Sequence, residues 1–130
     1  MTFADTYANP TGRTARGPFI GALLTLVAVA AFYFMLVKGR NGEWCLVTLL
    51  FPGFMLHARR LHDMGQTAWL LLVPLALSLA AAWLHLMNPG TSYEHPVTIA
   101  AIVLCAAFVL WGLVGKGQAE ANRFGEPATT

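Results

Sequence analysis

The sequence predicts an all-α protein: a polytopic membrane protein built as a bundle of four transmembrane helices, in a single domain of residues 1–130. Three observations lead to this prediction. The chain is 57% hydrophobic and only 11% charged, whereas about a quarter of the residues of a globular protein are charged. Four apolar stretches fill most of its length, at 18–37, 44–56, 68–87 and 97–114. Three of them approach the ~20 residues that a helix needs to cross ~30 Å of hydrocarbon, and no stretch has an ionisable side chain near its middle.

The first apolar stretch has some features of a signal peptide. It follows Arg13 and Arg16, and Ala28-Val29-Ala30 resembles a small-residue cleavage site. The apolar region of a signal peptide is only about 7–15 residues long, however, and here the apolar sequence continues to Val37. We therefore expect an uncleaved first helix over about 18–37.

The second apolar stretch is short. Its roughly 13 apolar residues would span only ~20 Å at 1.5 Å per residue. We therefore expect this helix to run from about 42 to 64, with Asn41 as its cap and Gly65 in the turn that follows. Pro52 should bend it, because proline removes one backbone hydrogen bond.

The third and fourth helices are expected over about 67–87 and 96–115. Thr67 can cap the third helix, and Pro74 should bend it. Pro96 suits the first turn of the fourth helix, where its missing N–H costs no hydrogen bond. The remaining polar residues, 1–16 and 117–130, are expected to form two cytoplasmic tails.

The basic residues predict which side of the membrane each helix end faces, since Lys and Arg accumulate on the cytoplasmic side. If the N-terminus lies inside, only Lys38 and Arg40 fall outside. The other basic residues then lie on the inner side: Arg13, Arg16, Arg59, Arg60, Lys116 and Arg123. We therefore expect both termini to be cytoplasmic. The tryptophans all fall near the membrane interfaces of this topology, at Trp44, Trp69, Trp83 and Trp111.

The most distinctive polar segment, Arg59-Arg60-Leu61-His62-Asp63-Met64-Gly65, lies at the inner end of the second helix. On a helix, Arg59 and Asp63 are i,i+4 neighbours, so we expect them to form an ion pair. Arg60 and His62 would then point elsewhere. Because a guanidinium can bind phosphate through two parallel hydrogen bonds, lipid phosphate is one expected partner.

This segment, followed by Thr67-Ala68-Trp69, resembles the RRLHD-x-G-x-S-G-W signature of the DUF805 membrane proteins, also called the YhaH-like inner-membrane family. Gly12-Arg13-Thr14-Ala15-Arg16 with Phe19 is similar to the family's lead into its first helix. Asn122-Arg123-Phe124-Gly125-Glu126-Pro127 resembles its C-terminal ending, although the spacing is loose and Ala68 replaces the usual glycine. The resemblance covers nearly the whole chain. It implies a bacterial inner-membrane protein but no reaction, because the family has no established general activity.

All three family-like segments fall on the expected cytoplasmic side, so we expect their polar residues to converge. In this hypothesis one arginine holds Asp63, while the remaining guanidiniums bind anionic lipid headgroups or a larger membrane protein complex. A polar cap that only anchors the bundle and satisfies the helix ends is the alternative for the same residues. The candidate binding residues are Arg13, Arg16, Arg59, Arg60, His62, Asp63, Asn122 and Arg123.

The leading functional interpretation is a non-enzymatic accessory or scaffolding protein in the membrane. The first alternative is a small transporter or channel subunit, which needs a polar route across the bundle. The candidates for that route are Thr25, Thr48, Ser78 and Thr98. The second alternative is a lipid-modifying enzyme that uses His62 and Asp63. The small-residue pattern Gly17-xxx-Gly21 leaves homo-oligomerisation open.

No metal, cofactor or nucleic-acid partner is expected. His57 and His62 are five residues apart and so lie on different helix faces, unlike the i,i+4 pair of a metal-binding helix. His85, Glu94 and His95 flank the outer loop, where we expect exposed polar residues in preference to a metal site. The net charge of +2 is too small to indicate nucleic-acid binding.

The two cysteines are expected to be unpaired packing residues. Cys45 lies at the outer start of the second helix, and Cys105 lies deeper, within the fourth. Their depths differ by roughly 8 Å at 1.5 Å per residue, which strains a disulfide.

Overall fold

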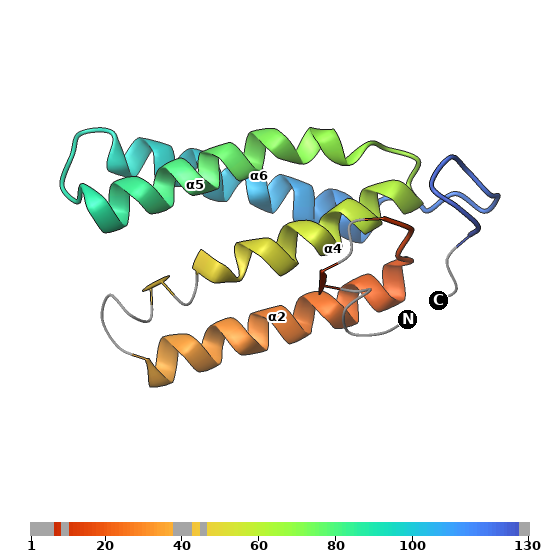
Figure 1. Ribbon diagram of the computed structural model, residues 1–130, viewed down its shortest axis with the longest axis horizontal. Helices are drawn as coiled ribbons and strands as arrows, with labels where there is room; N and C mark the ends of the chain where they lie inside the picture. The colour runs from red at the N-terminus through yellow and green to blue at the C-terminus, as the bar shows by residue number, and fades with distance from the viewer. Residues whose placement is uncertain (1–6, 9–10, 38–42, 45–46, 128–130) are drawn as a thin grey trace.

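The computed structural model describes residues 7–8, 11–37, 43–44 and 47–127, and these residues form an all-helical protein (Figure 1). The helices are α2 (Arg16–Leu36), α4 (Leu50–Asp63), the short 3-10 helix η1 (Ala68–Leu71), α5 (Leu72–Met87) and α6 (Glu94–Val114). The four α-helices lie lengthwise beside one another (Figure 1). The α5–α6 pair has the most extensive contact, and α2 packs against both α4 and α6.

Three helices are long and apolar enough to cross a membrane: Arg16–Leu36, Ala68–Met87 and Glu94–Val114, of 21, 20 and 21 residues. Large apolar side chains on them point outward, with Leu24, Phe34 and Val103 each more than 60% exposed. Such an exposed apolar surface is unfavourable in water and suits contact with lipid. The membrane character predicted from the sequence is therefore confirmed for three helices.

The predicted second helix is shorter in the structure than expected. The continuous helix α4 has 14 residues, or about 21 Å at 1.5 Å per residue, which is less than the ~30 Å of a hydrocarbon core. Residues 43–44 and 47–48 are also helical, whereas 38–42 and 45–46 lie outside the described residues. The expected cap Asn41 and the outer residues Lys38 and Arg40 therefore lie outside them too.

The predicted boundary between the second and third helices is confirmed in detail. The N–H of Gln66 donates to the carbonyl of Leu61 (2.8 Å), and the N–H of Gly65 donates to that of His62 (3.1 Å). This is the paired hydrogen bonding of a helix C-terminus that ends on a left-handed residue, and Gly65 has φ +79°. Thr67 Oγ1 then accepts from the N–H of Trp69 and caps η1.

The helix ends differ slightly from the predicted ones. α2 begins at Arg16 and α6 at Glu94, two residues earlier than expected, so Pro18 and Pro96 lie within the first turn and not at its first residue. The third span begins as a 3-10 turn, and its α-helical part starts at Leu72. A first turn tolerates proline because its N–H groups have no partner inside the helix.

The buried core lies near one end of the bundle. One cluster joins Phe19 and Ala22 of α2 to Leu56 of α4 and to Tyr7, whose hydroxyl donates to the Ala22 carbonyl (2.9 Å). A second cluster forms around the end of α4 and the start of the third span, from Ala58, Leu61, Met64 and Leu71. Both clusters lie close to the polar residues at the start of α2 and the end of α4.

Candidate functional site

The polar site lies where three segments meet at one end of the bundle: the residues before α2, the last turn of α4 and the residues after α6 (Figure 1). We call this site the polar cap. It comprises residues 11–16, 59–63 and 112–126, and it contains all eight residues singled out from the sequence. Most of these residues are buried, although they are among the most polar in the chain.

Asp63 is the centre of the polar cap. Its Oδ1 accepts from Arg13 Nε at 3.0 Å, and its Oδ2 accepts from Arg60 Nη1 at 2.6 Å. The side chains of both pairs are only 1% and 6% exposed. A buried charge is tolerated when it is both paired and hydrogen-bonded, as this carboxylate is.

Arg13 joins Asp63 to the C-terminal segment. Its Nη1 donates to the carbonyls of Glu120 (2.9 Å) and Gly125 (3.2 Å), and its Nη2 donates to the carbonyl of Gln118. The Gln118 N–H in turn donates to the Asp63 carbonyl at 2.7 Å. One buried guanidinium thus connects the segment before α2, the end of α4 and the chain after α6.

Arg60 connects α4 to the end of α6. Its Nε donates to the carbonyl of Gly112 at 2.8 Å, and its Nη2 donates to that of Gly115 at 2.7 Å. The last carbonyls of a helix have no partner within it and carry partial negative charge, so a buried cation stabilises them. Arg60 Nη1 also reaches the Thr14 carbonyl at 3.3 Å.

The predicted pairing of Arg59 with Asp63 is corrected by the structure. Asp63 instead pairs with Arg60, three residues before it, and with Arg13. Arg59 turns toward the segment before α2, where it donates to Thr14 Oγ1 (3.1 Å) and to the carbonyls of Arg13 (3.2 Å) and Thr11. Two arginines, not one, hold the carboxylate.

His62 contacts both the segment before α2 and the segment after α6. Because a carbonyl can only accept, His62 Nδ1–H donates to the Gly12 carbonyl, at 3.0 Å. The imidazole stacks on Phe124 with a centroid distance of 3.9 Å and an interplanar angle of 9°. Asn122 Nδ2 donates to the His62 carbonyl at 3.0 Å, and the Arg123 guanidinium lies 4.7 Å from the Phe124 ring centroid.

The protonation of His62 follows from this environment, which lies beyond the apolar part of the second predicted span. Burial lowers the pKa of His62, the hydrogen bond to Gly12 opposes that effect, and the positive charges of Arg59 and Arg123 lower the pKa further. The folded protein therefore favours the neutral ring, which stacks on Phe124 and donates from Nδ1.

Three cations of the polar cap remain exposed. Arg16 donates to the carbonyls of Val114 (3.1 Å) and Gly115 (3.0 Å) but is still exposed to solvent, as are Lys116 and Arg123. Arg16 and Lys116 line an open cleft of about 660 Å³, and Asp63 and Gly117 are also among its lining residues. The cleft is therefore an accessible positively charged surface above the buried ion pairs.

The sequence-based reasoning missed several residues of the polar cap. The carbonyl acceptors after α6 belong to residues whose side chains give no signal, such as Gly115 and Gln118. Gly117 packs directly over Asp63, and a Cβ there would collide with Asp63 Oδ2. The closely spaced glycines at 112, 115 and 117 were the available signal, because close backbone packing requires residues without side chains.

The chemistry that the polar cap can perform follows from these partners. Each oxygen of Asp63 is bound by a guanidinium, and the Nδ1–H of His62 is bound to a carbonyl. Within the described part of the chain, no three His, Cys, Asp or Glu side chains gather as a metal site. The buried residues are thus arranged to hold chain segments together.

The opposite end of the bundle has a smaller polar cluster. His85 Nδ1 lies 2.8 Å from Glu94 Oε1, and its Nε2 lies 3.1 Å from Glu43 Oε1. Glu94 Oε2 also accepts from the Gly90 N–H at 2.7 Å. His85 thus lies between two carboxylates, although its side chain is exposed, as is His95.

For the cysteines, Cys45 lies outside the described residues. Cys105 is a free thiol, and its Sγ lies 3.3 Å from Ser78 Oγ.

Comparison with protein-family models gives a match over nearly the whole chain. A family model described as "Protein of unknown function (DUF805)" matches residues 7–126. The matched range contains all three segments of the polar cap. No curated protein and no solved structure matches the chain.

Proposed function

This chain belongs to the DUF805 family, and we propose that it is a non-enzymatic accessory protein of the bacterial inner membrane that binds anionic lipid headgroups at its cytoplasmic surface. The proposal rests on a difference in burial between two groups of basic residues in the polar cap. Arg13, Arg59 and Arg60 are buried and hold the fold. Arg16, Lys116 and Arg123 are exposed at the same end of the bundle.

The proposed topology has four crossings with both tails inside. α2, α5 and α6 would cross directly, and α4 would cross together with the helical residues 43–44 and 47–48 that precede it. The basic residues support this orientation, because the polar cap contains six of the eight Lys and Arg residues of the chain. The anionic headgroups of the inner leaflet would then face the exposed cations.

The cleft lined by Arg16 and Lys116 suits a phosphate group for two reasons. An exposed cation near an anionic membrane contributes about 1 kcal/mol of attraction. Arg16 is also already positioned by its hydrogen bonds to Val114 and Gly115, so less side-chain entropy is lost when it binds a headgroup. A larger protein complex with an acidic surface is the other partner that this surface would accept.

The test is to remove two exposed charges that make no hydrogen bond to the buried network. The double variant Lys116→Gln/Arg123→Gln should lower the amount of phosphatidylglycerol that remains bound, relative to phosphatidylethanolamine, by about thirtyfold, since two charges at ~1 kcal/mol each are lost. Native mass spectrometry of the full chain, extracted in mild detergent, measures this ratio directly.

The matched control keeps the charges. Lys116→Arg/Arg123→Lys should retain the lipid ratio of the unchanged protein. If the charge-removing variant retains phosphatidylglycerol equally well, headgroup binding by these cations is wrong. If the charge-removing variant keeps its lipid but loses a copurifying protein, the partner of this surface is a larger protein complex.

The two alternative functions need features of their own. A transporter or channel subunit needs a polar route, yet Thr25 Oγ1 donates back to the Gly21 carbonyl of its own helix, and Ser78 meets Cys105. A lipid-modifying enzyme would need His62 and Asp63 to act on a substrate, and both side chains are engaged by other residues of the polar cap. Lipid binding at the exposed cations therefore has the better support.

A further inference from the structure

A second polar site lies at the end of the bundle opposite the polar cap, around His85 near the end of α5. The ring has a carboxylate at each of its two nitrogens. Nδ1 lies 2.8 Å from Glu94 Oε1 at the start of α6, and Nε2 lies 3.1 Å from Glu43 Oε1. Glu43 belongs to the helical residues that precede α4. One imidazole thus connects α5, α6 and the segment that leads into α4.

The number of protons on His85 decides which of these contacts can form. An ionised carboxylate only accepts, so each ring nitrogen must carry a proton to bond to its glutamate. A neutral imidazole has one N–H, whereas the imidazolium has two. His85 can therefore hold both ionised carboxylates only as an imidazolium.

The two glutamates are held unequally. Glu94 is buried, and its Oε2 also accepts from the N–H of Gly90 at 2.7 Å. The Glu43 side chain is 44% exposed. When His85 loses one of its two protons, the remaining N–H should stay with Glu94, which the turn before α6 already positions. The contact with Glu43 should then be lost.

Other groups near this site are not equivalent to the proton. His95 lies close enough to Glu94 to act on it through its charge, but its own side chain is exposed. A single metal ion cannot bridge the two carboxylates and the ring, because they meet opposite nitrogens of one imidazole. The geometry is that of a proton shared between two acids through a histidine.

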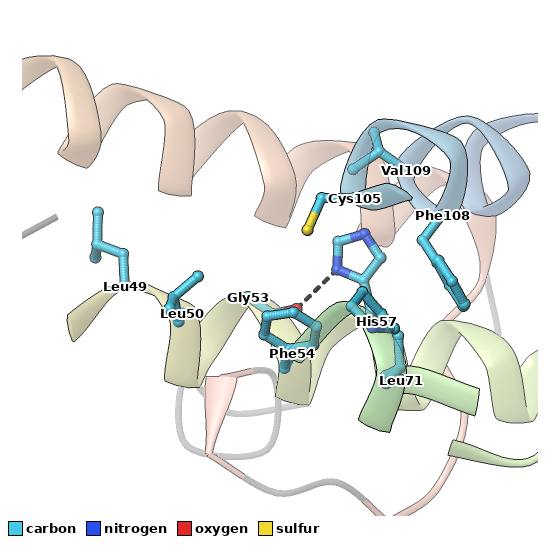
Figure 2. A pocket seen from close by; sticks show the side chains of 10 residues that line it. Leu49, Leu50, Gly53, Phe54, His57, Leu71, Cys105, Phe108 and Val109 are labelled. Atoms are coloured by element: carbon cyan, nitrogen blue, oxygen red, sulfur yellow. Dashed lines mark hydrogen bonds between the residues drawn. The ribbon is translucent and has the colours of Figure 1, made fainter. Parts of the chain in front are cut away.

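The contact with Glu43 matters because the first half of α4 is loosely packed. The buried residues of α4 all lie at 56–63, toward the polar cap. Next to its first half is a cavity of about 170 Å³, which Leu50 and Phe54 line from α4 and Phe108 lines from α6 (Figure 2). A close-packed interior resists displacement. A helix end beside open space can shift with little loss of contact.

We propose that His85 is a proton-binding site that holds the segment before α4 against the outer end of the α5–α6 pair. The imidazolium binds Glu43 and Glu94 together. Loss of one proton releases Glu43, and the first half of α4 can then move relative to α6. The released segment includes residues 43–44 and 47–48, which the 14-residue α4 needs to complete a crossing. In the proposed topology, which only this last step assumes, the site responds to the acidity outside the membrane.

A distance between two spin labels on the full chain in detergent tests the proposal. The labels are attached at Trp44→Cys and Ser92→Cys, two exposed positions, in a Cys45→Ser/Cys105→Ser background. At about pH 5, below the ordinary histidine pKa of about 6.5, the distance should be short and narrowly distributed. At about pH 8 a longer and broader population should grow. The ratio of held to released protein should change about two- to fivefold, because half-exposed ion pairs are weak.

Substitutions of His85 should fix the site in opposite states. His85→Arg keeps several donors and its charge at every pH, so it should show the short distance at both pH values. His85→Phe has no donor and should show the longer distance at both. Glu43→Gln should remove the pH response, since an amide can accept from the imidazolium and donate to the neutral ring. His95→Gln is the matched control and should keep the response.

Three results would overturn the proposal: the same distance distribution at both pH values in the labelled protein, a pH response that survives in Glu43→Gln, or a response that is lost in His95→Gln. The comparison of the two pH values needs no variant of His85 to fold. None of these substitutions touches the exposed cations of the polar cap, so the retention of phosphatidylglycerol tests the proposed function separately.

Discussion

At the scale of single residues, Asp63 has the most demanding position in the chain. It is a buried carboxylate held by two buried guanidiniums from different segments. Paired charges of this kind add little when complete, but removing one member leaves the others buried and uncompensated. The stability of the polar cap therefore depends on one negative charge.

Asp63→Asn should lower the free energy of unfolding by about 3–5 kcal/mol, because it leaves Arg13 and Arg60 without a counter-charge in a buried place. Unfolding in mixed detergent, followed by far-UV circular dichroism, measures the loss. Glu126→Gln is the matched control, since it removes an exposed acid of the same segment and should change stability by no more than about 0.5 kcal/mol. Equal stability of the two variants would show that Asp63 is not a structural centre.

His62 should make stability depend on pH. Its pKa is lowered in the folded protein, chiefly by burial, so the unfolded chain binds the proton more readily. The stability from the neutral ring is complete above the ordinary histidine pKa of about 6.5 and is lost as the pH falls below it. His62→Gln should therefore be less sensitive to acid between about pH 7 and pH 5 than the unchanged protein. Parallel curves for the two proteins would contradict the assigned role.

The sequence could not decide which arginine pairs with Asp63. Both Arg59 and Arg60 lie within reach on a helix, at i,i+4 and i,i+3. The choice depends on the carbonyls of Thr11 and Arg13, which draw Arg59 toward the segment before α2. Every residue carries a carbonyl, so such acceptors leave no trace in a sequence.

At the scale of elements, the length of an apolar stretch predicted a helix well where the helix carries few residues of the polar cap. α2 and α6 begin and end within two residues of their predicted bounds. The second helix was harder to predict, because its last two turns carry the polar residues of the cap and its apolar part is short. The C-terminal residues were expected to form a polar tail, yet residues 117–126 join the polar cap, where their carbonyls accept from Arg13 and the Gln118 N–H donates to the Asp63 carbonyl.

The close packing of the C-terminal segment on α4 can be tested at Gly117. Gly117→Ala should destabilise the fold by roughly 1–3 kcal/mol, because the added Cβ would collide with Asp63 Oδ2. Gly21→Ala is the matched control, since a Cβ there meets open space and alanine favours a helix. Thermal unfolding of the two variants in the same detergent gives the comparison. A stable Gly117→Ala variant would show that this segment does not pack on Asp63.

At the scale of the whole molecule, the bundle has two chemically different ends. One end gathers the polar cap and the exposed cations, and the other has the turn at 88–93 and the His85 cluster (Figure 1). Such asymmetry suits a protein that sits across a membrane and meets anionic headgroups on one side. The core lies under the cap, so the fold is most strongly held where the proposed function takes place.

The account depends most on the two tails and the α4–α5 turn lying on one side of the membrane. Labelling of single cysteines in intact cells with a membrane-impermeant thiol reagent tests this directly, in a Cys45→Ser/Cys105→Ser background. The three exposed positions to substitute are Gln66, Ala119 and Ser92. Cysteines at 66 and 119 should be protected until the membrane is opened, and one at 92 should react from outside. Opposite labelling of 66 and 119, or equal labelling of 119 and 92, would contradict a polar cap on the cytoplasmic side.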